Sequence, residues 1–358
     1  MIFVPQYKLK SGMKLASNID LNYNKKSDAF LLTKGKILTE KNINKLISFG
    51  VLGVYIEDGR TNEILDNRFK KESVLAIKTI FDSCGNTHRI LAKNTIRQIE
   101  KVSEMLVRNI KKNKEITIGI SDLQTYDANT YLHSLSVTVI AIAIGTELGL
   151  DRTQLCNLGV CAMLHDIGKV EIPIEIISKP GKLTESEYDI VKTHTTLGAK
   201  YISGNKEINK DIYLGVISHH EKFDGTGYPE GLKKMEIPFF GRIIAVSDVY
   251  DALTANRPYR KPVKPSEAIE YIMGGIGTSF DYDIVKAFLK KIETYPIGSR
   301  VWLSDGRTGD VIKGNPNDPL RPVLKIIGGK EEILDLHNDF NLKNIVISGI
   351  DYNYLINK

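Results

Sequence analysis

The chain has 358 residues, of which 42% are hydrophobic, so it can form roughly two or three domains of about 150 residues with buried cores. Its formal net charge of +6 suits an anionic small ligand and is too small to indicate binding of a DNA or RNA polymer. We expect a cytoplasmic protein without membrane insertion, because no apolar run reaches the ~18 residues that span a bilayer and the N-terminus lacks the regions of a signal peptide.

The first part of the chain, residues 1–59, predicts a small α/β accessory module. Short apolar runs alternate with glycine-containing turns, which is typical of short strands. Thr39 is a suitable N-cap for a helix that ends before Gly50.

Residues 60–115 predict a helical connector, because apolar side chains recur at spacings of three and four. These side chains are Ile96, Ile99, Val102, Leu106 and Ile110. The pattern has two interpretations. The helix packs on its own chain, or the helices of residues 66–113 form a homodimer or connect to a signalling partner.

The rest of the sequence predicts a mainly α fold with a small β-rich end. Residues 116–290 show no strand-like alternation, so we expect a helical catalytic domain there. From residue 291 to 358, apolar runs flank an Asp305-Gly306 turn, which indicates a hairpin within a small C-terminal β-rich appendage.

Five of the seven histidines lie between residues 133 and 220, on or beside apolar segments. Together with two aspartates they form the candidate ligand set: His133, His165, Asp166, His194, His219, His220 and Asp248. Burial of imidazole or carboxylate is costly unless the group is paired or bound to metal. Each histidine alone also fits a hydrogen-bonded structural role, but the whole set predicts a polynuclear metal site. No Cys-x-x-Cys pair is present, so a thiolate zinc site is not expected.

Four motifs in the region of residues 120–290 resemble the HD-GYP family, a branch of the HD phosphohydrolases. The motifs are His165-Asp-Ile-Gly-Lys169, Lys179-Pro-Gly181, His219-His-Glu-Lys-Phe-Asp-Gly-Thr-Gly-Tyr-Pro229, and Asp248-Val-Tyr-Asp-Ala-Leu-Thr254 followed by Arg257-Pro-Tyr-Arg260. The resemblance implies a helical bundle around two or three metals. It also implies hydrolysis of the bacterial second messenger cyclic di-GMP to pGpG, and often on to GMP.

Motif matching implies how the ligands divide between two metals. One metal takes His133, His165, Asp166 and Asp248, and the second takes His194, His219 and His220 with Asp166 bridging. Two metals ~3.5–4 Å apart can activate a water as hydroxide by lowering its pKa toward ~7. Imidazole and carboxylate donors suit iron, manganese, nickel or zinc better than calcium, and the resemblance favours iron or manganese.

Asn129 is a departure from the family pattern. Three-metal members have a glutamate four residues before the first histidine, and Asn129 stands at that position. An amide is a poorer ligand than a carboxylate, so we expect two divalent metals per domain. The departure leaves open whether hydrolysis stops at pGpG.

Further motif residues are expected around the substrate and the ligands. Lys169, which we pair with Asp166 as catalytic, can neutralise a phosphate oxygen in the transition state. The expected substrate contacts are Lys169, Lys179, Gly225, Gly227, Tyr228, Arg257 and Arg260. Asp251 is expected to support a ligand imidazole, and Asp224 to brace the glycine-rich loop. Each of these assignments has a structural alternative. Lys169 can be an ordinary surface lysine, the glycines can form a surface turn, Tyr228 can pack against its neighbours, and Asp251 can lie on a helix surface.

Three functions remain open at this point. The first is a cyclic di-GMP phosphodiesterase, and the second is a phosphodiesterase for another cyclic dinucleotide such as 3′,3′-cyclic GMP-AMP. The third is a non-catalytic receptor or scaffold, which the complete ligand set disfavours. A diguanylate cyclase or another signalling protein is the partner that such an activity suggests.

Overall fold

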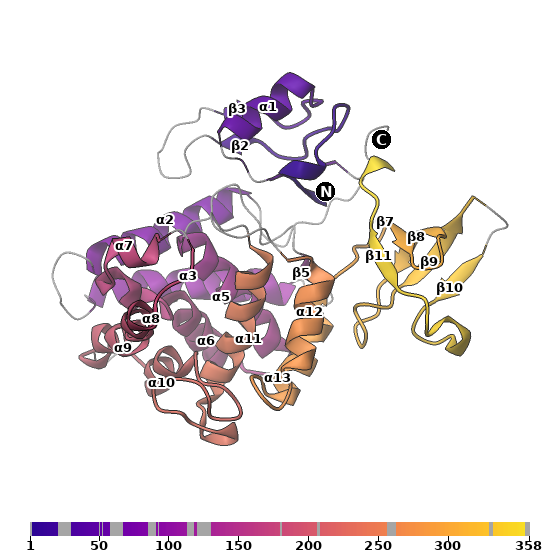
Figure 1. The fold of residues 1–358 in the computed structure, drawn as a ribbon. Coiled ribbons are helices and arrows are strands. Elements are labelled where there is room, and N and C mark those ends of the chain that lie inside the picture. Colours follow the sequence, from indigo (N-terminus) through magenta and orange to yellow (C-terminus); the bar gives the residue numbers. More distant parts are fainter. Residues whose placement is uncertain are drawn as a thin grey trace. The chain divides into compact units, whose positions relative to one another are not determined.

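A computed structural model describes most of the chain (Figure 1). The described residues are 2–20, 30–49, 51, 53–57, 67–84, 91, 93–112, 118–119, 130–179, 181–205, 208–255, 263–328 and 332–354. The chain divides into two compact units. Unit 1 comprises Met1–Glu63, Thr117–Asp127 and Leu289–Lys358, and unit 2 comprises Ile64–Ile116 and Ala128–Phe288. The segment expected to be a connector and the segment expected to be the catalytic domain therefore belong largely to the same compact unit.

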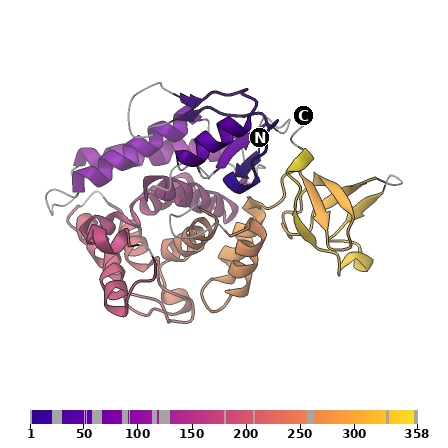
Figure 2. The same cartoon turned by 45° about the horizontal axis from the view of Figure 1, so that its top comes forward.

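Unit 2 is a bundle of helices, and the predicted mainly α fold is confirmed (Figure 2). Its longer described helices are α2 (Asn67–Cys84), α3 (Lys93–Lys112), α5 (Thr130–Glu147), α6 (Arg152–Leu164), α8 (Glu185–Lys192), α9 (His194–Ser203), α10 (Lys210–Ser218), α11 (Phe239–Thr254), α12 (Pro265–Gly274) and the greater part of α13 (Tyr282–Lys291). Shorter elements are α7 (Ile174–Ile177), η2 (Ile167–Glu171) and η3 (Lys234–Glu236).

Helices α5 and α6 form the centre of unit 2. Residues 137–144 of α5 and 158–164 of α6 are all buried, as expected of helices that are apolar around their whole circumference. Helix α6 begins at a capping box, in which Asp151 and Gln154 exchange side-chain-to-backbone hydrogen bonds. Helices α3, α10 and α11 pack around this pair.

The predicted apolar face of α3 packs within its own unit. Ile96, Ile99, Leu106 and Ile110 are buried, and α3 lies against α6. The Ser103 hydroxyl donates a hydrogen bond of 2.7 Å to the carbonyl of Cys156 in α6. This packing matches the first interpretation of the connector pattern, and a homodimer through residues 66–113 stays a prediction.

Unit 1 contains small antiparallel sheets and one described α-helix. Strands β1 (Ile2–Pro5) and β4 (Gly53–Ile56) pair, as do β2 (Ile19–Asp20) and β3 (Phe30–Leu32), and α1 (Glu40–Ser48) begins at Thr39 as the sequence predicts. A five-stranded sheet has the order β10-β9-β8-β7-β11. Its strands are β7 (Arg300–Leu303), β8 (Thr308–Lys313), β9 (Val323–Ile327), β10 (Ile333–Asp335) and β11 (Ile347–Ile350).

The two ends of the sequence contribute to one hydrophobic core in unit 1. Ile350, Tyr352 and Tyr354 pack against the core formed by the N-terminal module. The parallel strands β5 (Ile118–Gly119) and β6 (Ile292–Glu293) add a further pairing in this unit. In the described part of the chain, no helix has the length and apolar character needed to cross a membrane.

Candidate metal centre

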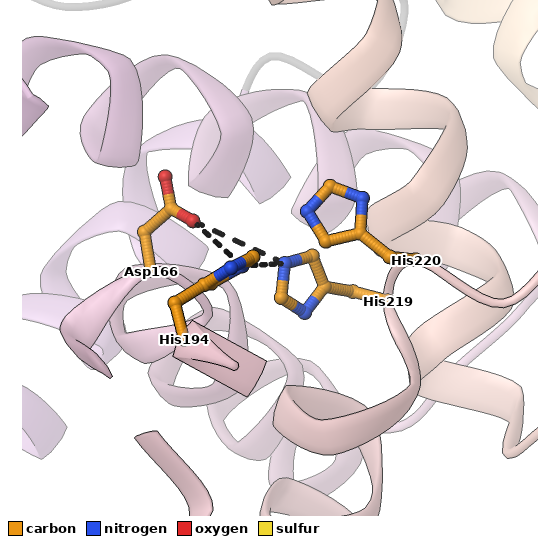
Figure 3. A group of neighbouring side chains, drawn as sticks. All are labelled: Asp166, His194, His219 and His220. Atoms are coloured by element: carbon orange, nitrogen blue, oxygen red, sulfur yellow. Dashed lines mark hydrogen bonds and ion pairs between the residues drawn. The ribbon is translucent and has the colours of Figure 1, made fainter. Parts of the chain in front are cut away.

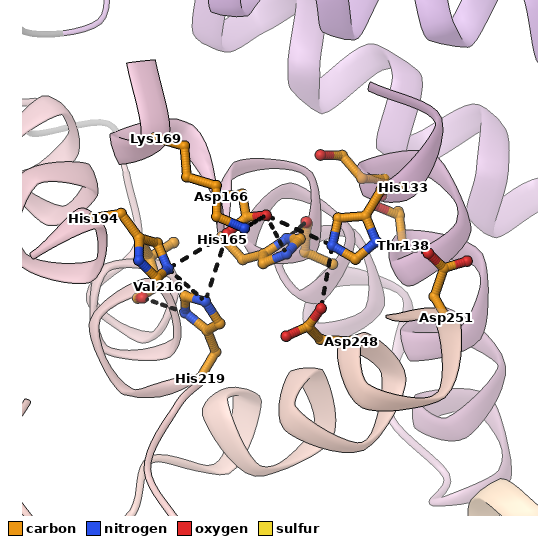
Figure 4. A network of polar contacts seen from close by, with 12 residues as sticks. His133, Thr138, His165, Asp166, Lys169, His194, Val216, His219, Asp248 and Asp251 are labelled. Carbon is orange, nitrogen blue, oxygen red and sulfur yellow. Dashed lines mark hydrogen bonds and ion pairs between the residues drawn. The ribbon is translucent and has the colours of Figure 1, made fainter. Parts of the chain in front are cut away.

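The candidate ligands come from the ends and inner faces of helices in unit 2. His165 and His219 follow the last residues of α6 and α10, and His194 begins α9 one residue after α8 ends. His133 lies in the first turns of α5 and Asp248 within α11. Figure 4 shows that these side chains point toward one another although they come from separate elements.

The ligand atoms form two groups, each with all its ligand atoms within 4.8 Å of one another. The first, which we call the four-ligand group, contains Asp166, His194, His219 and His220 (Figure 3). The second, the three-ligand group, contains His133, His165 and Asp248. Motif matching divides the histidines and Asp248 in the same way and assigns Asp166 to both metals.

Asp166 lies between the two groups. Its Oδ1 is 3.4 Å from His194 Nε2 and 4.0 Å from His219 Nε2. Its Oδ2 is 3.6 Å from His133 Nε2 and 3.4 Å from His165 Nε2. Because each oxygen faces a different group, this carboxylate has the position that a bridge between two cations requires.

Three histidine rings are oriented by the same hydrogen bond. In His165, His194 and His219, Nδ1 lies 2.7 Å from the carbonyl oxygen three residues earlier. These carbonyls, of Ala162, Val191 and Val216, belong to the last turns of α6, α8 and α10. Carbonyls at a helix C-terminus lack partners within the helix. The Nδ1–H therefore donates to such a carbonyl, and Nε2 keeps a lone pair that points to the centre.

His133 is oriented by a carboxylate instead. Its Nδ1 lies 2.7 Å from Asp251 Oδ2, and its Nε2 lies 3.2 Å from Asp248 Oδ1. Burial lowers the pKa of His133, but hydrogen bonds to Asp248 and Asp251 outweigh burial and raise it to about 9. The two carboxylates thus stabilise positive charge at this ring, where a bound cation would also be stabilised.

The four-ligand group favours neutral imidazoles beside a charged carboxylate. Burial holds the pKa of His219 well below its usual value and lowers the pKa of His220 to about 3. Burial by itself would raise the pKa of Asp166, but the positive charge of Lys169 beside it holds that pKa well below its usual value. Neutral imidazole and ionised carboxylate are the forms that bind metal.

Unpartnered polar atoms support a metal site. Among the described residues, His165 Nε2 and Asp166 Oδ1 are buried and have no hydrogen-bond partner. A buried polar atom without a partner is destabilising by about 1–3 kcal/mol. These atoms converge with further nitrogen and oxygen donors and with no thiolate, so the described residues fit divalent metal ions.

Two lysines of the motifs have different surroundings. Lys169 lies at the centre, with Nζ 2.5 Å from Asp166 Oδ2. Lys179 Nζ lies 2.7 Å from each carboxylate oxygen of Glu187 in α8. The structure therefore brings Lys169 to the ligands and pairs Lys179 with an acidic side chain.

The loop after His220 places an aromatic ring on the centre. The ring of Tyr228 stacks on His220 with 4.8 Å between centroids. Gly225 has a φ of +85°, as a turn with a left-handed residue requires. A Cβ on Gly227 would lie 2.2 Å from the backbone nitrogen of Lys222, so no larger residue fits. The loop's own packing therefore explains both glycines.

The two aspartates expected to have supporting roles, Asp251 and Asp224, have different contacts in the structure. Asp251 contacts the ligand His133. Asp224 is exposed and accepts hydrogen bonds from the backbone nitrogen and hydroxyl of Thr226 within the loop. Asn129, Arg257 and Arg260 lie outside the described residues, and their roles stay predictions.

Sequence reasoning missed Glu221, which organises the same loop. Its buried carboxylate accepts hydrogen bonds from the backbone nitrogens of Glu230, Gly231 and Leu232, at 2.7, 3.1 and 3.1 Å. The only signal in the sequence was its place directly after two ligands. Tyr188 of α8 was also missed as a neighbour of the site, and its ring lies edge-on to Tyr228 at 6.5 Å.

Comparison with known proteins places this centre in a family. Residues 97–284, more than half of the chain, match the family model described as "HD domain". The chain belongs to the HD domain family. Over 218 residues it is 36% identical to the cyclic di-GMP phosphodiesterase PA4108 of Pseudomonas aeruginosa, covering 61% of this chain and 52% of that protein. The resemblance inferred from the motifs is confirmed.

Two further matches extend beyond the HD domain. The cyclic di-GMP phosphodiesterase PdeB of Borreliella burgdorferi is 25% identical over 352 residues, which cover 90% of each protein. The solved structure of Bd1817, an HD-GYP-type protein of Bdellovibrio bacteriovorus, aligns with a TM-score of 0.52 at 17% identity. It covers 80% of this chain and 97% of that one, and it supports the fold alone.

Proposed function

We propose that this protein is a metal-dependent phosphodiesterase that hydrolyses cyclic di-GMP to pGpG. The observation that carries the proposal is the meeting of two ligand groups at Asp166, whose two oxygens face different groups. The P. aeruginosa relative, of which the chain spans about half the length, is named for this activity.

Two metal ions fit the two groups. His133, His165 and Asp248 would hold one, His194, His219 and His220 the other, and Asp166 would contact both. Bound divalent cations lower the pKa of water toward neutrality and offset the negative charge of the attacked phosphate. The nitrogen and oxygen donors favour iron or manganese in our proposal, with nickel or zinc as alternatives.

The chain's own side chains supply orientation and charge. Lys169 Nζ, held by Asp166, is within reach of a phosphate oxygen at the centre and can donate a hydrogen bond to it. Tyr228 covers one side of His220. Arg257 and Arg260 remain our candidates for phosphate contacts, because a guanidinium binds phosphate through two parallel hydrogen bonds.

A metal-resolved assay with product analysis tests the proposal. The protein is purified without oxygen, loaded with iron or manganese, and given cyclic di-GMP or 3′,3′-cyclic GMP-AMP in parallel. We expect turnover of cyclic di-GMP with pGpG as the product. Preference for the hybrid dinucleotide would move the assignment to the second candidate. No turnover of either with either metal would contradict an enzymatic role and leave a receptor or scaffold.

A cellular experiment separates catalysis from a scaffold role. A chain with both His165→Ala and Asp166→Ala lacks ligands of both groups. We expect it to lose any effect on cellular cyclic di-GMP, and an unchanged phenotype would support a scaffold. A cytoplasmic location and a diguanylate cyclase or other signalling partner stay predictions.

A further inference from the structure

We propose that the hydroxyl of Tyr201 is a positioning group for the four-ligand group. It joins the two elements that carry Asp166 and His194, which are neighbouring ligands in that group. The inference rests on the proposed metal site and names a residue outside the ligand set.

The two elements are packed backbone to backbone at the ligand end. Asp166 immediately precedes η2, and His194 is the first residue of α9. A Cβ on Gly168 of η2 would lie 2.0 Å from the carbonyl oxygen of His194 and 2.5 Å from the nitrogen of Gly198. Only glycine allows this approach, so the ligand end of the η2–α9 pair is tightly fixed.

The other end of the same pair is joined by Tyr201. The hydroxyl of Tyr201 in α9 donates a hydrogen bond to the carboxylate of Glu171, the last residue of η2. Tyr201 is 5% exposed, so water does not compete freely for this bond. Burial, and then the hydrogen bond to Glu171, raise the pKa of Tyr201, which keeps the hydroxyl a donor.

Helix geometry relates this bond to the ligand spacing. Tyr201 follows His194 by seven residues, about two turns, so both side chains lie on the same side of α9. A rotation of α9 about its axis would move both of them relative to η2. The Glu171–Tyr201 bond opposes that rotation, and it thereby maintains the 3.4 Å separation of Asp166 Oδ1 and His194 Nε2.

Tyr201 also contacts the end of α2 and a residue just before α3. Its Oη lies 3.3 Å from the carbonyl of Cys84 at the end of α2, and its own carbonyl accepts a hydrogen bond of 3.0 Å from Leu91 N. One hydroxyl proton cannot serve two acceptors fully, and a carboxylate is a stronger acceptor than a carbonyl. Glu171 is therefore the main partner, and its loss is the change to test.

The positioning role is tested by measuring how tightly the folded protein binds Mn²⁺. We expect Tyr201→Phe, which removes only the hydroxyl, to raise the Kd for Mn²⁺ about 3- to 10-fold at one of two sites, because supporting groups behind ligands tune metal affinity. Calorimetric titration of metal-free protein reports both Kd values. Tyr271→Phe removes an exposed hydroxyl from α12 and serves as the matched control.

Conservative substitution at the partner supplies a second arm. Glu171→Gln keeps a carbonyl oxygen that can accept from Tyr201, so its Kd should lie between those of wild type and Tyr201→Phe. Adding Glu171→Gln to Tyr201→Phe should weaken Mn²⁺ binding little further, because the bond is already lost. Fully additive losses would contradict a shared contact.

The outcomes separate this inference from the proposed function. A Tyr201→Phe protein that unfolds at a lower temperature but binds Mn²⁺ at both sites as tightly as wild type overturns the positioning role alone. Wild-type protein that binds no Mn²⁺ overturns the proposed metal site, and the positioning role with it. A selective loss at one site in Tyr201→Phe, absent in Tyr271→Phe, supports the inference.

Discussion

The two ligand groups contain the same kinds of donor but differ in how one histidine is supported. In the four-ligand group, His194 and His219 lie at helix boundaries, and backbone carbonyls fix their rings. In the three-ligand group, the Ala162 carbonyl fixes His165 in the same way, but His133 lies within α5 and the Asp251 side chain fixes its ring. A backbone carbonyl survives every side-chain substitution, whereas Asp251 does not. The three-ligand group should therefore be more sensitive to substitutions directly behind its ligands.

Asp166→Asn tests what the two groups share and should have the largest effect. An amide leaves one oxygen to serve two groups, so both lose a charged ligand. Metal-ion stabilisation of the transition state is worth several kcal/mol and each ~1.4 kcal/mol is tenfold in rate, so kcat should fall by about 10³. Steady-state kinetics on cyclic di-GMP measure the loss, with the exposed Asp283→Asn of α13 as the control. Wild-type kcat in Asp166→Asn would be incompatible with a shared ligand.

Lys169→Met tests the cation that contacts the shared carboxylate. We expect kcat to fall by about 10² with a smaller change in KM, because a group that acts in the transition state mainly affects kcat. Metal content should stay at the wild-type level, since Lys169 is not a ligand. A rise in KM alone would show instead that Lys169 binds the substrate uniformly.

Asp251→Ala tests the side-chain support of the three-ligand group. Loss of a carboxylate behind a ligand histidine typically weakens metal binding by about 10- to 100-fold. One of two Kd values for Mn²⁺ should rise accordingly, and Asp251→Asn, which keeps an acceptor for His133 Nδ1, should lose less. If both Kd values match those of wild type, the contrast between side-chain and backbone support is wrong.

Glu221→Gln should have the smallest effect on the centre itself. It removes the charge that accepts three backbone hydrogen bonds in the Tyr228 loop. Hydrogen bonds to charged groups contribute about 1.5–3 kcal/mol, and glutamine keeps part of that, so the free energy of unfolding should fall by about 1–2 kcal/mol. Chemical denaturation measures it. Metal affinity lost without lost stability would place Glu221 among the groups behind the four-ligand group.

The sequence predicted residues whose chemistry is unusual for their position. Histidines and aspartates beside apolar helices stand out because their burial is costly, and the order of the motifs indicated how they divide. The connector helix followed from apolar spacings of three and four, and the helical catalytic domain from the lack of strand-like alternation. Contacts between ordinary residues far apart in the chain give no such signal. The Glu171–Tyr201 bond and the pairing of Lys179 with Glu187 could be found only in the structure.

Packing between distant segments was equally hidden. Ile350 and Tyr354 pack with the N-terminal core of unit 1, although the sequence suggests separate modules at the two ends. Apolar residues at a strand end predict burial, but the sequence does not indicate which segment will cover them. Gly227 similarly looked like a place where a ligand approaches, and the structure shows the loop's own backbone there.

In the proposed centre, each ligand group holds one metal ion and Asp166 links the two ions. Electron paramagnetic resonance of manganese-loaded protein, with the metal content measured on the same sample, tests it most directly. We predict two equivalents of manganese per chain and a spectrum of two magnetically coupled ions, replaced by an uncoupled signal in Asp166→Asn. Three equivalents, or two ions without coupling in the wild type, would contradict the account.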